Sequence, residues 1–291
     1  VLYNIYIYIY IYMNKFLIVL AINSLLIFIV NLKIIDKKLS YFNLIFTSFL
    51  VVVIGTNLES NNSLDIEVID ENMSYLYPII MSVFIVTIFL IIKYLKKYKD
   101  IIIRIIFFSS IVINLVNILP FNEIIIYIIT FAWFVFDYYT KGKYYKLKLY
   151  MNNLIAILIS ISSINLIQLK NINTGIILLV GLFLFDIFWV FGSKYIFKES
   201  VMETVAVNID MPLLLKYFYS EDRPIMLGLG DIIIPGLFLK LLVNTNKFYP
   251  CLIAYIISLI SAIVANTLTN LPQPALLYIV PGILGTFYFK K

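Results

Sequence analysis

Long apolar runs, separated by short polar loops, constrain the fold of this 291-residue chain more than any other feature. About 20 apolar residues in a helix cross the hydrocarbon core of a bilayer, and several of the runs are close to that length. Because some runs are shorter, the ends of the predicted helices are defined only to within a few residues. The sequence therefore predicts an all-α polytopic fold of about nine to ten transmembrane helices, surrounded by lipid bilayer. The runs are Phe16–Leu32, Tyr41–Gly55, Tyr77–Leu95, Ile101–Leu119, Ile124–Phe136, Leu149–Leu169, Thr174–Phe197, Pro224–Val243, Pro250–Leu268 and Pro272–Phe289.

The N-terminal part of the chain has an unusual composition. Residues 1–12 alternate Ile and Tyr almost perfectly, so we expect a non-native extension there and a true start at Met13. The run after Met13 fits either a signal peptide or a first transmembrane helix, and the lack of a small-residue cleavage site favours the helix. Residues 13–170 are then predicted to form N-terminal transmembrane helices, and residues 171–291 a second transmembrane region that holds the motifs described below.

The residue types that are missing narrow the chemistry. The chain has no histidine and a single cysteine, Cys251. The first absence excludes a Ser-His dyad and histidine zinc sites, and the second excludes an intrachain disulfide. The excess of lysine is scattered over the loops between helices, which argues against a nucleic-acid partner. Carboxylate chemistry remains, and we expect neither a metal nor a cofactor.

Two aspartates lie within the predicted transmembrane segments. Asp186 is near the middle of its segment, roughly 18 Å deep at the helical rise, whereas Asp231 is only about seven residues into the next one. Ionisable groups at membrane depth are costly and mark candidate functional sites. Two antiparallel helices would hold these carboxylates at different depths, unless the start of the second segment is stretched.

The stretch before Asp231 is suited to an extended conformation. Gly228 and Gly230 lower the preference for helix, and they let backbone or a bound peptide come close. We therefore predict that 226–230 is unwound. Pro235 and Gly236 predict a second kink, because proline removes a backbone hydrogen bond.

Two carboxylates a few ångström apart cannot both ionise cheaply, so we expect them to share one proton. One would act as general base on water, while the other, protonated, would hydrogen-bond the scissile carbonyl. Prolines around the last apolar run indicate that a helix starts or breaks there, and the free backbone groups of a broken helix could pair with an extended peptide. The sequence thus favours peptide hydrolysis without a metal or a covalent intermediate.

Three short motifs resemble a known family in their order and spacing: Phe185-Asp186, Gly-Leu-Gly-Asp at 228–231, and Gln-Pro-Ala-Leu at 273–276. They are similar to those of the signal peptide peptidases, intramembrane aspartyl proteases related to presenilin. The resemblance is strong across 174–289 and only architectural before it. It implies that Asp186 and Asp231 are the catalytic pair. It also implies a set of residues that bind substrate or shape the active site: Phe185, Gly228, Gly230, Gln273, Pro274, Ala275 and Leu276.

The resemblance further implies residence in the endoplasmic reticulum membrane and cleavage of signal peptides and other type II transmembrane segments. It leaves self-association into a homo-oligomer open. Two departures are visible. The family usually has tyrosine where this chain has Phe185. The family orientation also puts the lysine-rich loops at 33–38, 93–99 and 141–148 in the lumen, whereas the charge rule puts them in the cytosol. We follow the family, because its motifs match closely and loop charge is a statistical bias.

Two other classes of protein could use buried aspartates. A proton-coupled or sodium-coupled transporter would carry ions on them, but such transporters usually contain internal repeats, and the first half of this chain has no counterpart to either aspartate motif. A protein that binds membrane segments without cutting them is the other alternative, and the presence of both aspartates argues against it.

Overall fold

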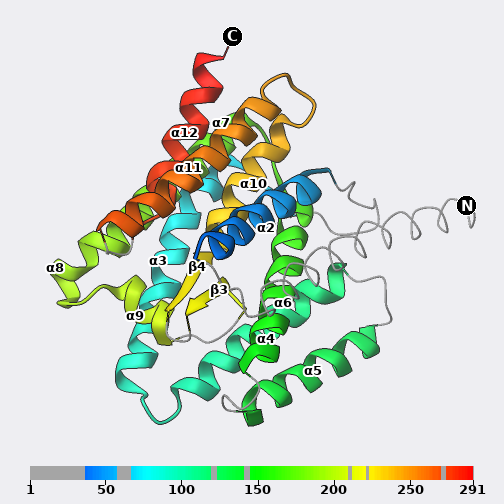
Figure 1. Ribbon diagram of the computed structural model, residues 1–291, viewed down its shortest axis with the longest axis vertical. Coiled ribbons are helices and arrows are strands. Elements are labelled where there is room, and N and C mark those ends of the chain that lie inside the picture. Colours follow the sequence, from blue (N-terminus) through cyan, green and yellow to red (C-terminus); the bar gives the residue numbers. More distant parts are fainter. Residues whose placement is uncertain are drawn as a thin grey trace, which may run out of the picture. The chain divides into compact units, whose positions relative to one another are not determined.

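The computed structural model describes residues 37–57, 67–118, 123–140, 145–208, 212–220, 223–269 and 273–290 (Figure 1). Within these residues, each of the nine apolar runs predicted from Tyr41 onward contains a helix, so the all-α expectation is confirmed. The first run and residues 1–12 lie outside the described part. The helices are α2 (Lys37–Asn57), α3 (Glu71–Tyr94), α4 (Lys99–Ile118), α5 (Glu123–Thr140), α6 (Tyr145–Leu166), α7 (Ile172–Ile187), α8 (Ser193–Phe197), α9 (Val201–Asn208), α10 (Gly230–Leu242), α11 (Phe248–Thr269) and α12 (Leu276–Phe289).

Five helical spans in the described residues are long and apolar enough to cross a membrane. One of them is composite: α7 continues through a π-helical turn, η1 (Phe188–Gly192), into α8 without a break. Two further apolar helices are shorter. The five spans are Lys38–Asn57, Glu71–Tyr94, Leu147–Leu166, Ile172–Phe197 and Phe248–Thr269.

Four short strands differ from the prediction of helices alone. β1 (Glu67–Ile69) pairs in parallel with β2 (Ile167–Leu169), so the run predicted as 149–169 leaves the helix after Leu166. β3 (Leu214–Ser220) pairs antiparallel with β4 (Arg223–Gly228). Pro224 explains part of this difference, because the residue before a proline avoids helical backbone.

The stretch before Asp231 is extended, as predicted. β4 ends at Gly228, Leu229 forms a turn, and α10 begins at Gly230. α10 continues through Pro235 and Gly236, so the kink predicted there does not interrupt the helix.

The described chain divides into two compact units, and one of them comprises the described parts of 1–54, 108–162 and 212–229. Here the β3–β4 hairpin is fixed to helices by polar side chains. Asn153 of α6 pairs with the Lys216 backbone twice, donating from Nδ2 to its carbonyl at 2.8 Å and accepting from its amide at 3.0 Å. The hydroxyls of Thr47 and Tyr217 are 2.9 Å apart. The two Asn153 bonds satisfy backbone groups of a non-helical segment, as an apolar environment requires.

The other unit comprises the described parts of 55–107, 163–211 and 230–291, and it contains both aspartates. β1 and β2 lead directly into α3 and α7, so the starts of these two helices are held together. Asn171 strengthens the connection: its Oδ1 caps α7 by accepting from the Thr174 amide at 2.7 Å, and its Nδ2 donates to Glu71 Oε1 at 3.1 Å. In the same unit α11 and α12 lie side by side (Figure 1).

Candidate active site

Asp186 lies at the penultimate position of α7 and is only 6% exposed. Its Oδ2 accepts a hydrogen bond from the Leu276 amide at 3.3 Å. Leu276 is the first residue of α12, and the first amides of a helix have no partner within the helix. Asp186 therefore supplies a cap from a different helix, in the place where the partial positive charge of a helix N-terminus favours a carboxylate.

Two contacts with α3 bracket Asp186 along α7. Five residues before it, Gly181 packs on Pro78, where a Cβ would come within 2.7 Å of the proline Cγ. Three residues after it, the Trp189 indole donates to Ser82 Oγ at 3.0 Å. Trp189 belongs to the π-helical turn, a feature that is frequent at functional sites. α3 therefore fixes α7 on both sides of the carboxylate.

Asp231 is the second residue of α10 and is half-buried. In an α-helix its carbonyl would accept from the amide of residue 235, but Pro235 has no N–H. The Tyr255 hydroxyl, fully buried on α11, donates to this carbonyl at 3.4 Å. A side chain from a neighbouring helix thus takes the place of the donor that proline removes.

The packing of α7, α10 and α12 defines the relative height of the two aspartates. Asp186 is level with Leu276 through their hydrogen bond. Gly175 lies eleven residues before Asp186 on α7, and it contacts Phe238 of α10. The Phe238 ring in turn lies 5.7 Å from the ring of Phe287, which follows Leu276 by eleven residues on α12. Therefore α7 and α12 run antiparallel, and the Phe238 level lies about 16 Å from the Asp186 level.

Asp231 lies seven residues before Phe238, or about 10 Å along α10. The contact of the Asp231 carbonyl with Tyr255 shows on which side of the Phe238 level Asp231 lies. Lys247, which directly precedes α11, donates to the Phe287 carbonyl at 2.9 Å. Tyr255 lies about two turns further along α11, away from the Phe287 end. Both aspartates thus lie on the same side of the Phe238 level, with an axial offset of about 6 Å, or one helical turn.

The Gln-Pro-Ala-Leu motif forms the start of α12. The backbone carbonyls of Pro274 and Ala275 accept from the amides of Leu277, Tyr278 and Ile279. Gln273 donates from Nε2 to Thr269 Oγ1 at 3.1 Å and accepts from the Tyr278 hydroxyl at 3.4 Å. Of the two expectations for the prolines, a helix start is found at Pro274, which lies two residues before α12, and these carbonyls accept hydrogen bonds within the first turn. The helix is continuous through Pro281, so no break is present there.

The remaining predicted residues have separate places. Phe185 packs against a hydrophobic cluster that includes Trp189, and the centroids of the two rings are 6.3 Å apart. Gly228 pairs with Leu214 in the hairpin. Gly230 is exposed, and a Cβ there would meet only Ile234 among the described atoms, at 3.6 Å. Packing in the described residues therefore does not demand glycine at position 230.

Sequence reasoning missed Ser82 and Tyr255, each of which lies beside an aspartate-bearing helix. Pro235, four residues after Asp231, is a signal that the Asp231 carbonyl needs another donor. The identity of that donor is a tertiary feature, since Tyr255 is one of many tyrosines in apolar runs.

Tyr255→Phe tests the replacement of the missing helical donor. The substitution leaves the partly buried Asp231 carbonyl without this bond, so we expect a loss of about 1 kcal/mol in the free energy of unfolding. Thermal unfolding in detergent measures it, with Tyr249→Phe on the exposed side of α11 as the matched control. Equal midpoints for the two variants would contradict the role of Tyr255.

The apolar helices and the buried carboxylate define an all-α polytopic membrane protein. The family model described as signal peptide peptidase matches residues 59–290, a range that includes both aspartates, and the chain belongs to the signal peptide peptidase family. This confirms the resemblance found in the sequence.

Individual relatives align with a smaller part of the chain. The signal peptide peptidase of Mus musculus is 41% identical over 150 residues, which cover 46% of this chain and 38% of the relative. The signal peptide peptidase of Homo sapiens is 39% identical over 150 residues, with the same shares. Intramembrane protease 2 of Caenorhabditis elegans is 36% identical over 162 residues, which cover 46% of this chain and 33% of the relative. The alignments thus span well under half of each relative's length.

Proposed function

We propose that this protein is an intramembrane aspartyl endopeptidase, in which Asp186 and Asp231 activate water for hydrolysis of a peptide bond. The proposal is supported by the contact between α7 and α10 at Gly175 and Phe238, from which the helical rise gives a difference in height of about one turn between the two aspartates. Both lie in the region that matches the signal peptide peptidase family.

In the proposed reaction, one carboxylate removes a proton from water, and the water oxygen bonds to the scissile carbonyl carbon. The other carboxyl group, protonated, donates a hydrogen bond to the carbonyl oxygen. The C–N bond then breaks, the leaving nitrogen takes a proton, and the products are a carboxylate and an amine. The chain reaches Asp231 from an extended strand through an exposed glycine, which supports access of an unwound substrate to that carboxylate.

The proposed substrates are signal peptides and other type II transmembrane segments in the endoplasmic reticulum membrane. The mouse and human relatives are called signal peptide peptidases, and the worm relative an intramembrane protease. A helical substrate hides its peptide bonds, so cleavage requires a segment that unwinds locally.

Cleavage of a labelled type II signal-peptide segment by the purified protein in liposomes tests this proposal. We expect two products whose masses place the cut inside the transmembrane segment. Intact substrate across several segments, with correctly folded protein, would contradict the proposal. A proton or sodium flux in the same liposomes would then favour the transporter alternative.

A further inference from the structure

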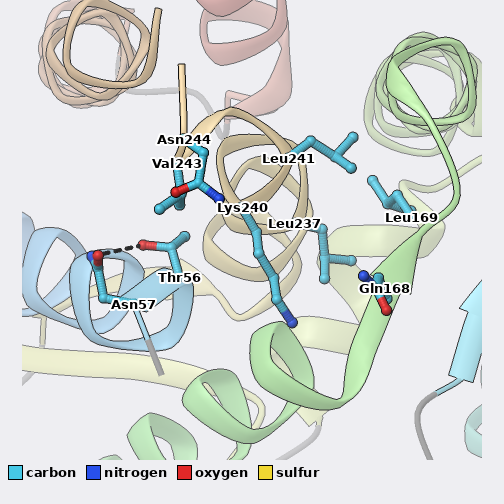
Figure 2. A pocket seen from close by; sticks show the side chains of 9 residues that line it. All are labelled: Thr56, Asn57, Gln168, Leu169, Leu237, Lys240, Leu241, Val243 and Asn244. Carbon is cyan, nitrogen blue, oxygen red and sulfur yellow. Dashed lines mark hydrogen bonds between the residues drawn. The ribbon is translucent and has the colours of Figure 1, made fainter. Parts of the chain in front are cut away.

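The described residues contain a pocket of about 530 Å³ at the C-terminal end of α10, and neither aspartate lines it (Figure 2). Lys240 is the one charged side chain among the nine residues that line it. Figure 2 shows this side chain running from α10 along the pocket toward the end of α6. The lining residues are Thr56, Asn57, Gln168, Leu169, Leu237, Lys240, Leu241, Val243 and Asn244.

The Lys240 ammonium binds the C-terminal end of α6. Its Nζ donates to the carbonyls of Ile164 at 2.8 Å, Asn165 at 2.7 Å and Ile167 at 3.4 Å. α6 ends at Leu166, and the last carbonyls of a helix have no donors within the helix. An ammonium has three donors, and its charge is favoured at the negative end of the helix dipole. Lys240 therefore caps α6 from a different helix.

A second contact on α10 lies one turn earlier, on the same face. A Cβ at Gly236 would come within 2.6 Å of Ile164 Cδ1, so α10 approaches the end of α6 as closely as glycine allows. Lys240 follows Asp231 by nine residues, which is two and a half helical turns. Asp231 and Lys240 thus lie on opposite faces of α10, and any rotation or slide of this helix moves both.

We propose that Lys240 is a positioning residue that holds α10, and with it Asp231, at a fixed rotation and height against the end of α6. The inference deepens the proposed proteolytic function and rests on it. Without the ammonium, the carbonyls of Ile164, Asn165 and Ile167 lose this donor. Of the two contacts with the end of α6 described above, α10 then keeps the apolar one at Gly236. A displacement of about 1 Å at a reacting group can lower a rate by two orders of magnitude.

Steady-state cleavage of the labelled segment in liposomes tests the proposal. Lys240→Met keeps the length and apolar stem of the side chain but removes the donors, so we expect kcat to fall at least about tenfold with KM within about twofold. Lys240→Arg keeps charge and donors, and the adjoining pocket gives the larger head room, so we expect at least about half of the wild-type kcat. Gly236→Leu keeps the ammonium but adds a side chain too large for a shift of Ile164 Cδ1 alone to accommodate, so α10 moves away from Ile164 and kcat should also fall.

Lys247→Met is the matched control. Lys247 also caps carbonyl oxygen near a helix end, donating to Phe287 of α12 at 2.9 Å, but it lies in the turn after α10. We expect a similar loss of thermal stability with unchanged kcat per folded molecule. A kcat equal to that of the wild type in Lys240→Met, or an equal fall of kcat in Lys240→Met and Lys247→Met, would overturn the positioning role. The proposed proteolytic function would not be affected, because the wild-type protein would still cleave the segment. If Lys240→Met does not fold, wild-type kcat in folded Gly236→Leu overturns the positioning role. Absence of cleavage by the wild type would instead refute the proposed function.

Discussion

Asp186→Asn and Asp231→Asn are each expected to lower the rate of transmembrane-segment cleavage by at least about a thousandfold. Asparagine has nearly the same shape as aspartate but cannot accept a proton from water or donate one as a carboxylic acid. General acid–base catalysis typically contributes factors of about 10²–10⁴, and a shared-proton pair needs both members. Product formation under single-turnover conditions, in liposomes with excess enzyme, measures this loss.

Both variants should fold like the wild type. The amide oxygen of asparagine can still accept from the Leu276 amide, so the cap on α12 persists in Asp186→Asn. The double variant should be no slower than the slower single variant, because residues that act as a unit are not additive. Asp100→Asn, at an exposed position on α4, is the control and should keep full activity. More than about a tenth of wild-type activity in either single variant would be incompatible with a catalytic pair.

Gly175→Leu has the second largest expected effect, because this position fixes the distance between the two aspartate-bearing helices. A Cβ there would lie 2.8 Å from Phe238 Cδ2 and 3.1 Å from Leu241 Cδ1, so a larger side chain pushes α7 away from α10. Overpacking of this kind costs about 1–3 kcal/mol of stability. We expect cleavage to fall at least about tenfold, because the carboxylates move apart.

Gly285→Leu on α12 is the matched control for this substitution. No described atom lies within 4 Å of the Cβ that would be built at Gly285, so the added side chain meets open space. Its thermal midpoint and cleavage rate should match those of the wild type. Wild-type cleavage by Gly175→Leu would show that the α7–α10 contact does not set the separation of the aspartates.

Local sequence signals predicted the features that depend on nearby residues. Apolar runs of helical length predicted the helices, and the glycines before Asp231 predicted the extended stretch that β4 provides. The same signals could not predict β1 and β2, because their pairing joins residues about a hundred positions apart. Three-residue strands within longer apolar or polar stretches leave no periodic pattern.

The contacts of the candidate site are also largely tertiary. The motifs indicated that Asp186 and Leu276 belong to one site, but the hydrogen bond between them depends on where α12 begins. In the sequence, Lys240 is one lysine near the end of an apolar run. Only the position of the α6 terminus shows what its ammonium binds. The contacts of the site therefore depend on where helices begin and end, and helix ends are the least predictable parts of an apolar sequence.

The affinity of a peptide analogue that carries a hydroxyl in place of the scissile bond tests most directly whether the two aspartates act as one pair. Such an analogue resembles the hydrated intermediate and needs no knowledge of the natural substrate. We expect tight binding to the wild-type protein in detergent, and a loss of at least about a hundredfold in both Asp186→Asn and Asp231→Asn. Unchanged affinity in either folded variant would contradict a catalytic pair formed by Asp186 and Asp231.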